Sequence, residues 1–303
     1  MSASPSTLRP LLGAEAQARP SRPVTLDAGG PASAAFVEIA AECTDHFRTN
    51  AELLLGSRAM PHLHQTRVGI RRLRSAFSLF RPLLRDVPAA LSVVHRLRAL
   101  ALPFGPARDL DVLLAGPLAD DLDPDQLARL SADREAAYDV ALAVLRSEPW
   151  ADAVHQVRGI ALLAPWPGVT DPPVLELEAR ALEKRWRRVV GPLDQLAAMS
   201  PAERHLVRIE AKKLRYGCEF FASLHPATPQ VVTASGESLS RPLAFGRQAE
   251  QVQTALGLVN DHATAEDLLV GVGSHAPSVD EHRLVDEAVE AVRTLAALDP
   301  FWR

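Results

Sequence analysis

The sequence lacks the features of membrane-spanning and disulfide-stabilised secreted proteins. No apolar run is long enough to span a bilayer, and the first residues lack the apolar centre of a signal peptide. The chain has two cysteines, Cys43 and Cys218, and both lie inside apolar helical patterns, which is not the arrangement of a disulfide framework. We therefore expect a cytoplasmic protein without membrane association, whose two cysteines belong to the core.

Aromatic residues and, in one stretch, acidic residues are also scarce. Only 5% of the chain is aromatic, which is little for a protein that stacks the bases of single-stranded nucleic acid on its rings. The stretch from Arg58 to Arg85 contains seven arginines and no acidic residue, although the formal net charge of the chain is −4. Acidic residues gather elsewhere, at 109–135 and 266–290. Positive charge is thus concentrated on one face, which predicts an anionic partner there.

The apolar residues recur with helical spacing. The chain has 303 residues and is 47% hydrophobic, so it can bury a substantial core. Two helix starts are marked by Asp123-Pro124 and Ser200-Pro201, each with a glutamine or glutamate three residues after the capping side chain. The spacing predicts an all-α protein with helices over 32–55, 61–82, 88–103, 107–119, 125–147, 150–163, 174–191, 201–224, 241–258, 260–272 and 280–297.

Stretches rich in proline and glycine divide the chain. Residues 1–30 are rich in Pro, Gly, Ser and Ala without periodicity, and we interpret them as a flexible N-terminal segment. The stretch 164–173, APWPGVTDPP, cannot continue a helix. We expect one compact domain over 31–303, with a first helical half at 31–165 and a second at 174–303.

One cationic helix occurs twice. HQTRVGIRRLRSAFSLF, which begins at His64, returns 141 residues later as HLVRIEAKKLRYGCEFF, which begins at His205. At about 100° per residue, the basic residues of each copy share one arc and the apolar residues occupy the opposite arc. The two cationic arcs consist of His64, Arg67, Arg71 and Arg74 in the first copy and of His205, Arg208, Lys212 and Arg215 in the second.

A second, weaker repeat follows each basic helix. The segment from Gly105 to Asp109, GPARD, aligns with the segment from Gly257 to Asp261, GLVND. Two similar helical bundles related by an approximate two-fold axis would explain both repeats. Like charges stacked on one helix face repel each other, so each cationic arc needs either a bound polyanion or carboxylates from neighbouring helices, and the sequence leaves both alternatives open.

Taken together, these motifs resemble the CHAD family, the conserved histidine α-helical domain. The resemblance rests on H-x-x-R-x-x-x-[RK]-[RK]-L-R in both copies, on ARDLDVL at 107–113 and on LGLVNDH at 256–262. It covers nearly everything after residue 30. It implies a pseudo-symmetric pair of helical bundles that binds inorganic polyphosphate through a basic cavity between them.

The resemblance assigns polyphosphate binding to the two cationic arcs, with Arg72 and Lys213 as secondary members. The sequence departs from the family pattern at Pro103, which should kink or end a helix, and at Gly69, which weakens the first basic helix. Neither departure removes a cation.

A third basic cluster lies on the predicted helix over 174–191. Helical spacing places Arg180, Lys184 and Arg187 on one side of it. Lys184 and Arg187 would extend the cationic surface of the second half. A plain solvated face is the alternative for this cluster.

A metal-assisted hydrolase of polyphosphate or phosphoesters and a protein that binds nucleic acid through its backbone are the main alternatives. The repeated carboxylates of Asp109, Asp111 and Asp261 are too few for a two-metal site, and they fit helix caps or partners for arginines better. No two histidines have the i, i+4 spacing of a metal site on a helix. We therefore expect a binding protein rather than an enzyme, with no metal and no cofactor. His64 and His205 either donate to phosphate or belong to the core.

Polyphosphate granules are one place where such a surface could act. A receptor, a regulator and a granule coat would all need only the binding surface, and nothing in the sequence identifies a protein partner.

Overall fold

The structure is a computed structural model that describes residues 17–226, 230–232 and 236–303. Residues 1–16, part of the predicted flexible segment, lie outside this range. The all-α class is confirmed, because helices account for nearly all elements within the described residues. These elements are α1 (Ala32–Ser57), α2 (Met60–Leu79), α3 (Arg81–Leu84), α4 (Pro88–Ala101), α5 (Phe104–Ala115), η1 (Pro117–Asp121), α6 (Pro124–Leu145), α7 (Glu148–Leu162), α8 (Val174–Val190), η2 (Leu193–Ala198), α9 (Pro201–Phe221), η3 (Ala222–Leu224), β1 (Gln230–Val232), β2 (Ser238–Ser240), α10 (Arg241–Val270) and α11 (Glu281–Ala297).

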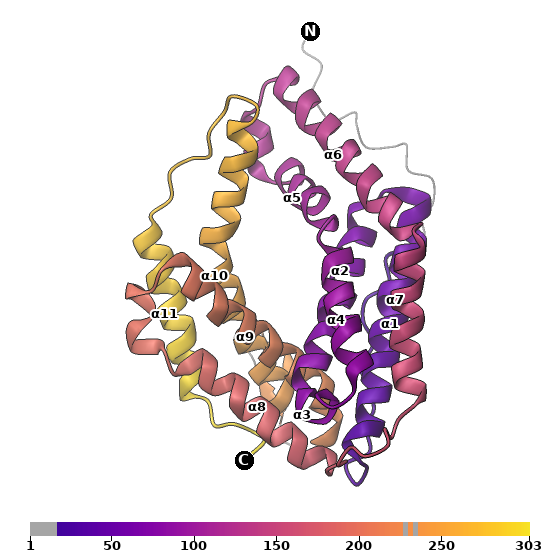
Figure 1. The fold of residues 1–303 in the computed structure, drawn as a ribbon. Helices are drawn as coiled ribbons and strands as arrows, with labels where there is room; N and C mark the ends of the chain where they lie inside the picture. The colour runs from indigo at the N-terminus through magenta and orange to yellow at the C-terminus, as the bar shows by residue number, and fades with distance from the viewer. Residues whose placement is uncertain (1–16, 227–229, 233–235) are drawn as a thin grey trace.

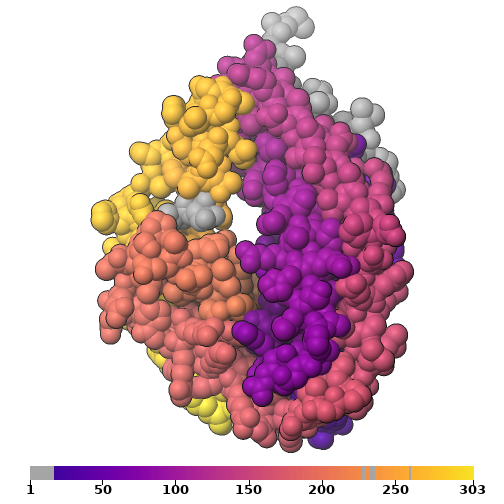
Figure 2. Space-filling model, in the orientation of Figure 1, coloured from indigo at the N-terminus to yellow at the C-terminus, as the bar shows by residue number. Residues whose placement is uncertain are grey.

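The helices are arranged as a ring around an opening. Helices α1 to α7, drawn from indigo to pink in Figure 1, form one side, and helices α8 to α11, drawn from salmon to yellow, form the other. The space-filling view in Figure 2 shows the opening between the two sides. The division into two halves and their two-fold relation stay predictions.

One end of the ring is closed by the main core. Helix α2 packs against α9, and α1 packs against α8. The rings of Phe80 and Phe221, which follow corresponding positions of the two basic helices, have centroids 5.8 Å apart. Both rings are fully buried, so the two sides share one hydrophobic core at this end.

The other end of the ring is closed by a smaller apolar cluster. Leu110 and Leu113 of α5 share it with Leu269 near the end of α10. The side chain of Arg129 on α6 also donates a hydrogen bond to the backbone carbonyl of Val272 at 3.1 Å. The opening is therefore enclosed along its rim by contacts between the two sides.

Several local predictions are confirmed. Cys43 and Cys218 are free and fully buried. The predicted capping boxes at Asp123 and Ser200 both form, with each side chain accepting from the backbone three residues on. No helix runs through 164–173.

Three elements differ from the prediction. Helix α10 is continuous where the sequence predicted a break near residue 259, since a long packed helix tolerates weak helix formers in its interior. The predicted helix over 61–82 ends at Leu79, and a short helix restarts with Pro82 in its first turn. The hairpin of β1 and β2 was not predicted, because three-residue strands are too short to reveal a period of two.

Residues 17–30 run along α1 instead of standing apart from the fold. The side chain of Asn50 accepts a hydrogen bond from the backbone of Arg19 at 3.0 Å and donates one to its carbonyl at 2.9 Å. Val24 and Leu26 are buried in the core. The packed part of the chain therefore begins before the predicted boundary, because a segment without periodicity still contributes two apolar side chains.

Gly69 allows α1 and α2 to approach each other closely. A Cβ atom at this position would lie 2.6 Å from the Cβ atom of Phe47 and 2.8 Å from its backbone nitrogen. The glycine therefore serves the packing of α2 against α1, and this contact orients the cationic arc of α2 away from the core.

Candidate anion-binding site

Helices α2, α5, α9 and α10 surround the cationic arcs. The apolar arcs of α2 and α9 are packed in the core, with Ile70, Leu73, Val207 and Leu214 all buried. The opposite, cationic arcs therefore face the space between the helices that border the opening in Figure 1. The predicted duplication of charge thus brings two basic helices to the same opening.

A glycine of each Gly…Asp segment lies beside an arginine of the basic helices. A Cβ atom at Gly105 of α5 would lie 3.7 Å from Nη1 of Arg67, and one at Gly257 of α10 would lie 2.6 Å from Nη2 of Arg208. The Nε atom of Arg208 also donates to the backbone carbonyl of Gln253 at 3.2 Å. Gly257 is thus a notch in which the guanidinium group of Arg208 rests, whereas a side chain at Gly105 would still fit beside Arg67.

Asp261 pairs with an arginine of the basic helices, whereas Asp109 acts on one only through its charge. Asp261 has a carboxylate oxygen 3.7 Å from Nη2 of Arg208. Burial and the nearby Asp261 raise the pKa of Asp109, although Arg67 opposes this shift. Both aspartates lie inside helices, so neither caps a helix. Of the two, Asp261 has an arginine as its ion-pair partner.

Four cations of the arcs have no carboxylate partner among the described residues: Arg67, Arg71, Arg74 and Lys212 make no ion pair within 4.0 Å. The Nε atoms of Arg71 and Arg74 are buried without a hydrogen-bond acceptor. A cavity of about 210 Å³ lies against this part of α2 and is lined by Arg67, Arg71, Arg74, Arg98 and neighbouring apolar groups. Unpaired cations beside a cavity can bind an anion.

Crowding of positive charge lowers the pKa values of basic residues in the arcs. Burial, followed by the charges of Arg208 and Arg71, lowers the pKa of Lys212 to about 7. Because Arg71 belongs to α2 and Lys212 to α9, charges from the two sides of the opening act on each other directly. Burial and Arg71 likewise lower the pKa of Arg67 to about 10. An anion placed between these groups would relieve the repulsion.

The two histidines of the arcs have lowered pKa values, which favours their neutral forms. Burial and the charges of Arg108 and Arg71 lower the pKa of His64 to about 4. Burial and the charge of Lys212 lower the pKa of His205. His64 is half-buried and His205 is exposed, so neither is a fully buried core histidine.

Besides Arg208, three predicted residues of α2 and α9 have carboxylate partners. Arg72 is buried, pairs with Glu219 of α9, and lies over the ring of Phe220 at 4.9 Å from its centroid. Lys213 pairs with Glu210 at 2.7 Å, and Arg215 pairs with Glu219 at 3.1 Å and Glu250 at 2.7 Å. Arg72 therefore joins α2 to α9, and the structure does not group it with the unpaired cations.

The predicted cluster on α8 is exposed. Arg187 pairs with Glu183 at 2.6 Å. Lys184 has its pKa lowered by slight burial and by the charges of Arg185, Arg188 and Arg81. These cations share a shallow surface with Arg180.

Two arginines of the site carried little or no signal in the sequence. Arg98 of α4 lines the cavity and lowers the pKa of Arg74 after burial does. Arg108 acts on His64 and has a buried Nη1 atom without an acceptor. Its place directly before Asp109 in the ARDLDVL motif was the only available signal.

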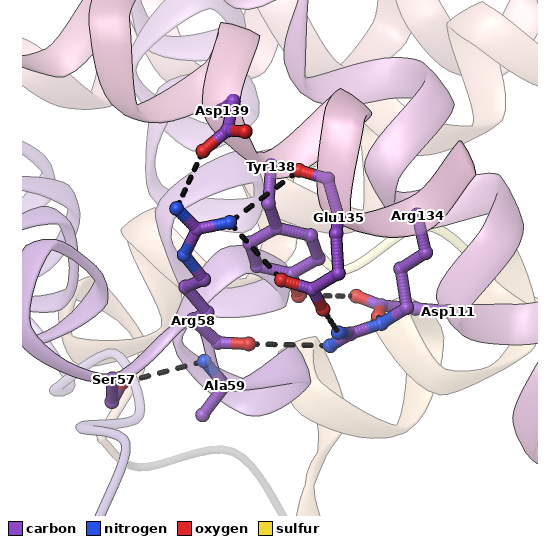
Figure 3. Close-up of polar contacts among 8 residues, drawn as sticks. All are labelled: Ser57, Arg58, Ala59, Asp111, Arg134, Glu135, Tyr138 and Asp139. Carbon is purple, nitrogen blue, oxygen red and sulfur yellow. Dashed lines mark hydrogen bonds and ion pairs between the residues drawn. The ribbon is translucent and has the colours of Figure 1, made fainter. Parts of the chain in front are cut away.

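Asp111, the third carboxylate of the first motif, has a structural role. Figure 3 shows its carboxylate between Arg134 and Tyr138 of α6. It accepts from Arg134 at 2.7 Å and from the hydroxyl of Tyr138 at 2.7 Å, and it is buried. These bonds fasten α5 to α6.

Across the described residues, no group of three or more His, Cys, Asp or Glu side chains is placed to hold a metal ion. None of the helices in the same residues is both long and apolar enough to cross a membrane.

Comparison with known proteins places the chain in a family. The family model of the CHAD domain matches residues 38–270. The chain belongs to the CHAD family. The crystal structure of the CHAD domain from the plant Ricinus communis is similar to it with a TM-score of 0.69 and 24% sequence identity, over 92% of this chain and 96% of that chain. A second similar structure is PptA from Streptomyces chartreusis, with a TM-score of 0.54 and 16% identity, over 88% of this chain and 97% of that chain.

At these identities, the two structures establish the CHAD fold and nothing more specific. No curated protein matches the sequence. The substrate or ligand of this CHAD protein must therefore be argued from its own residues.

Proposed function

We propose that this CHAD protein binds inorganic polyphosphate in the cationic opening between its two sides. The observation that carries the proposal is the pair of Arg71 and Lys212. They come from opposite sides, their charges act on each other, and neither has an ion-pair partner among the described residues. A polyanion that lies between them would neutralise both sides at once.

The chemistry of the lining fits phosphate better than nucleic-acid bases. Guanidinium groups bind phosphate oxygens through two parallel hydrogen bonds, and Arg67, Arg71 and Arg74 follow one another along α2 at helical spacing. Phe77 and Phe221, the aromatic residues of the basic helices that the sequence placed on apolar arcs, are buried in the core. The arcs thus offer phosphate partners without rings on which bases could stack.

The proposed role is binding without turnover. The carboxylate of Asp111 is buried and bonded to Arg134 and Tyr138. Asp261 pairs with Arg208, and Asp109 lies near Arg67. The same surface would serve a cytoplasmic receptor or a protein that associates with polyphosphate granules.

A titration tests this function directly. Full-length protein is titrated with long-chain polyphosphate and, at matched charge concentration, with single-stranded and double-stranded nucleic acid. We expect polyphosphate to bind most tightly and its affinity to fall steeply with salt, as for other polyanions that release counterions. Equal or tighter binding of either nucleic acid would contradict the proposal.

Variants locate the site. Arg71→Gln should weaken polyphosphate binding, because it removes an unpaired cation from the opening. Arg293→Gln is the matched control, since Arg293 is exposed on α11 and pairs with Glu290. Equal affinities of the two variants would place binding elsewhere.

Turnover is tested separately. Protein incubated with polyphosphate and magnesium or manganese should release no phosphate. Steady phosphate release that Asp109→Asn abolishes, in a variant that remains folded, would establish the hydrolase alternative instead.

A further inference from the structure

Lysine is rare in this chain. Lys184, Lys212 and Lys213 are its three lysines, and the other thirty basic residues of the Lys and Arg class are arginines. Two of the three are neighbours on α9, yet their surroundings differ. An arginine stays charged at all physiological pH values, whereas a lysine amine can lose its proton and become a nucleophile.

The charged groups that face Lys212 come from three helices. Arg208 and Arg215 lie on α9, Arg71 lies on α2, and Asp261 lies on α10. The three arginines oppose a charge on the amine, and Asp261 offsets them only in part. Among the described residues, no carboxylate lies within ion-pair distance of the Lys212 amine.

Lys213 provides a built-in comparison. It is partly buried like Lys212, but its amine contacts Glu210 at 2.7 Å. This carboxylate holds the Lys213 amine in an ion pair, whereas the Lys212 amine has no such partner among the described residues. Lys212 has its pKa lowered to about 7 by burial and by the neighbouring arginines, so a large fraction of its amine is neutral at pH 7.4. A lysine at its ordinary pKa of about 10.4 is only about 0.1% neutral at that pH.

We propose that Lys212 is a site of covalent acylation by acyl phosphates. This inference rests on the proposed anion-binding role of the opening, because the unpaired arginines around Lys212 would hold the phosphate group of the reagent. A small acyl phosphate held there would present its carbonyl carbon to the amine. One group of residues thus supplies both the attraction for the reagent and the neutral nucleophile.

The proposed reaction transfers the acyl group from a phosphate oxygen to the nitrogen of Lys212. The lone pair of Nζ forms a bond to the carbonyl carbon, and the bond between that carbon and the phosphate oxygen breaks. Phosphate leaves with the bonding electron pair, and it takes up the proton that the nitrogen loses. The products are an N-acyl lysine and inorganic phosphate, and no oxidant or reductant is needed.

Acylation would also change the opening. The amide that forms cannot carry a charge, so the modified protein loses a cation at the point where the two sides meet. We expect the acylated protein to bind polyphosphate more weakly than the unmodified protein.

The test is site-resolved acetylation. Full-length protein is incubated with acetyl phosphate at pH 7.4, and the initial rate of acetylation at each of the three lysines is measured by mass spectrometry. Lys212 should react at least about tenfold faster than Lys213, because its pKa is lowered to about 7 and its amine is unpaired, whereas Glu210 holds the amine of Lys213. Equal rates, or a faster Lys213, would overturn the proposal.

An uncharged acetylating reagent tests whether the phosphate group of acetyl phosphate directs the reaction to Lys212. The preference for Lys212 over Lys213 should be larger with acetyl phosphate than with the uncharged acetyl ester of N-hydroxysuccinimide. The Arg71→Gln variant should lose part of this preference, because it removes both a phosphate ligand and a charge that keeps Lys212 neutral. The same preference with both reagents would overturn the phosphate-guided step.

Competition separates this inference from the proposed function. Long-chain polyphosphate should protect Lys212 from acetylation while leaving Lys184 reactive. Selective acetylation of Lys212 that polyphosphate does not slow would support the modification site and count against polyphosphate binding. Polyphosphate binding with no preference for Lys212 would overturn the modification site alone.

Discussion

At the scale of single residues, burial and the crowding of positive charge in the opening lower the pKa values of its basic groups. The pKa values of Lys212 and His64 are lowered to about 7 and about 4, in each case by burial first and by neighbouring cations second. A bound polyanion favours the charged form of each group, so it raises these pKa values again. Binding must therefore take up protons, and affinity must rise as pH falls through the range between the bound and the free pKa.

Between pH 9 and 7, we expect the protonation of Lys212 to determine how affinity depends on pH. Wild-type affinity for polyphosphate should rise as pH falls from 9 toward 7 and should level off once Lys212 is protonated in the free protein as well. Lys212→Arg carries its charge at every pH in this range, so its affinity should stay nearly flat between pH 9 and 7. Isothermal titration in buffers of different ionisation enthalpy would measure the proton uptake. An equal uptake by wild type and variant would show that another group titrates.

Below pH 7, we expect the protonation of the two histidines to determine how affinity depends on pH. Below pH 7, His64 and His205 should add further tightening, which for His64 continues down to its free pKa of about 4. The double variant His64→Gln, His205→Gln should lose this tightening and keep the rise between pH 9 and 7. Fluorescence titrations at pH 7, 6 and 5 provide the comparison. A double variant with the wild-type slope would remove both histidines from contact with phosphate.

The sequence predicted the residues of the arcs better than their partners. Helical spacing alone grouped Arg67, Arg71 and Arg74 on one side of α2. It could not indicate that Arg72 pairs with Glu219 or that Arg215 pairs with Glu250, because these partners lie on other turns or other helices. Which cations remain unpaired is a tertiary property, and it decides which of them are free for an anion.

At the scale of elements, each repeated Gly…Asp segment packs against an arginine of a basic helix. The two copies are unequal, because the guanidinium group of Arg208 lies closer to Gly257 than that of Arg67 lies to Gly105. A Cβ atom would meet Nη2 of Arg208 at 2.6 Å in the first case and Nη1 of Arg67 at 3.7 Å in the second. The first distance requires a shift of the guanidinium group, whereas the second is an ordinary van der Waals contact.

This inequality gives a matched pair of variants. Gly257→Ala should displace Arg208 from Asp261 and weaken polyphosphate binding, while Gly105→Ala should change affinity little. Both substitutions place alanine inside a helix, where it is favoured over glycine by about 0.5–1 kcal/mol. Thermal unfolding of both variants is the control for stability. A larger loss of affinity in Gly105→Ala would contradict the assigned geometry.

The helices themselves were largely predictable, and their ends less so. Capping chemistry at Asp123 and Ser200 fixed two starts, since those signals are local. The continuity of α10 and the packing of residues 17–30 depend on contacts with distant parts of the chain, and local propensity carries no information about them.

At the scale of the whole molecule, the ring explains why the basic helix occurs twice. Each cationic arc extends only about 15 Å at about 1.5 Å per residue, but the contact between α2 and α9 brings the two arcs to one opening. The resemblance of the sequence to the CHAD family predicted a basic cavity between two bundles. The ring closure through Leu110, Leu113 and Leu269 could not be predicted, because it joins segments far apart in the sequence.

The most direct test of a composite site is the dependence of affinity on polyphosphate length. Full-length protein is titrated with triphosphate and with chains of increasing length at fixed salt, and affinities are compared per binding site. If both arcs contact one chain, affinity should rise with length until the chain spans both, and Arg71→Gln and Lys212→Gln should each reduce this gain. Triphosphate that binds as tightly as long chains, with no difference between the variants and wild type, would contradict the account.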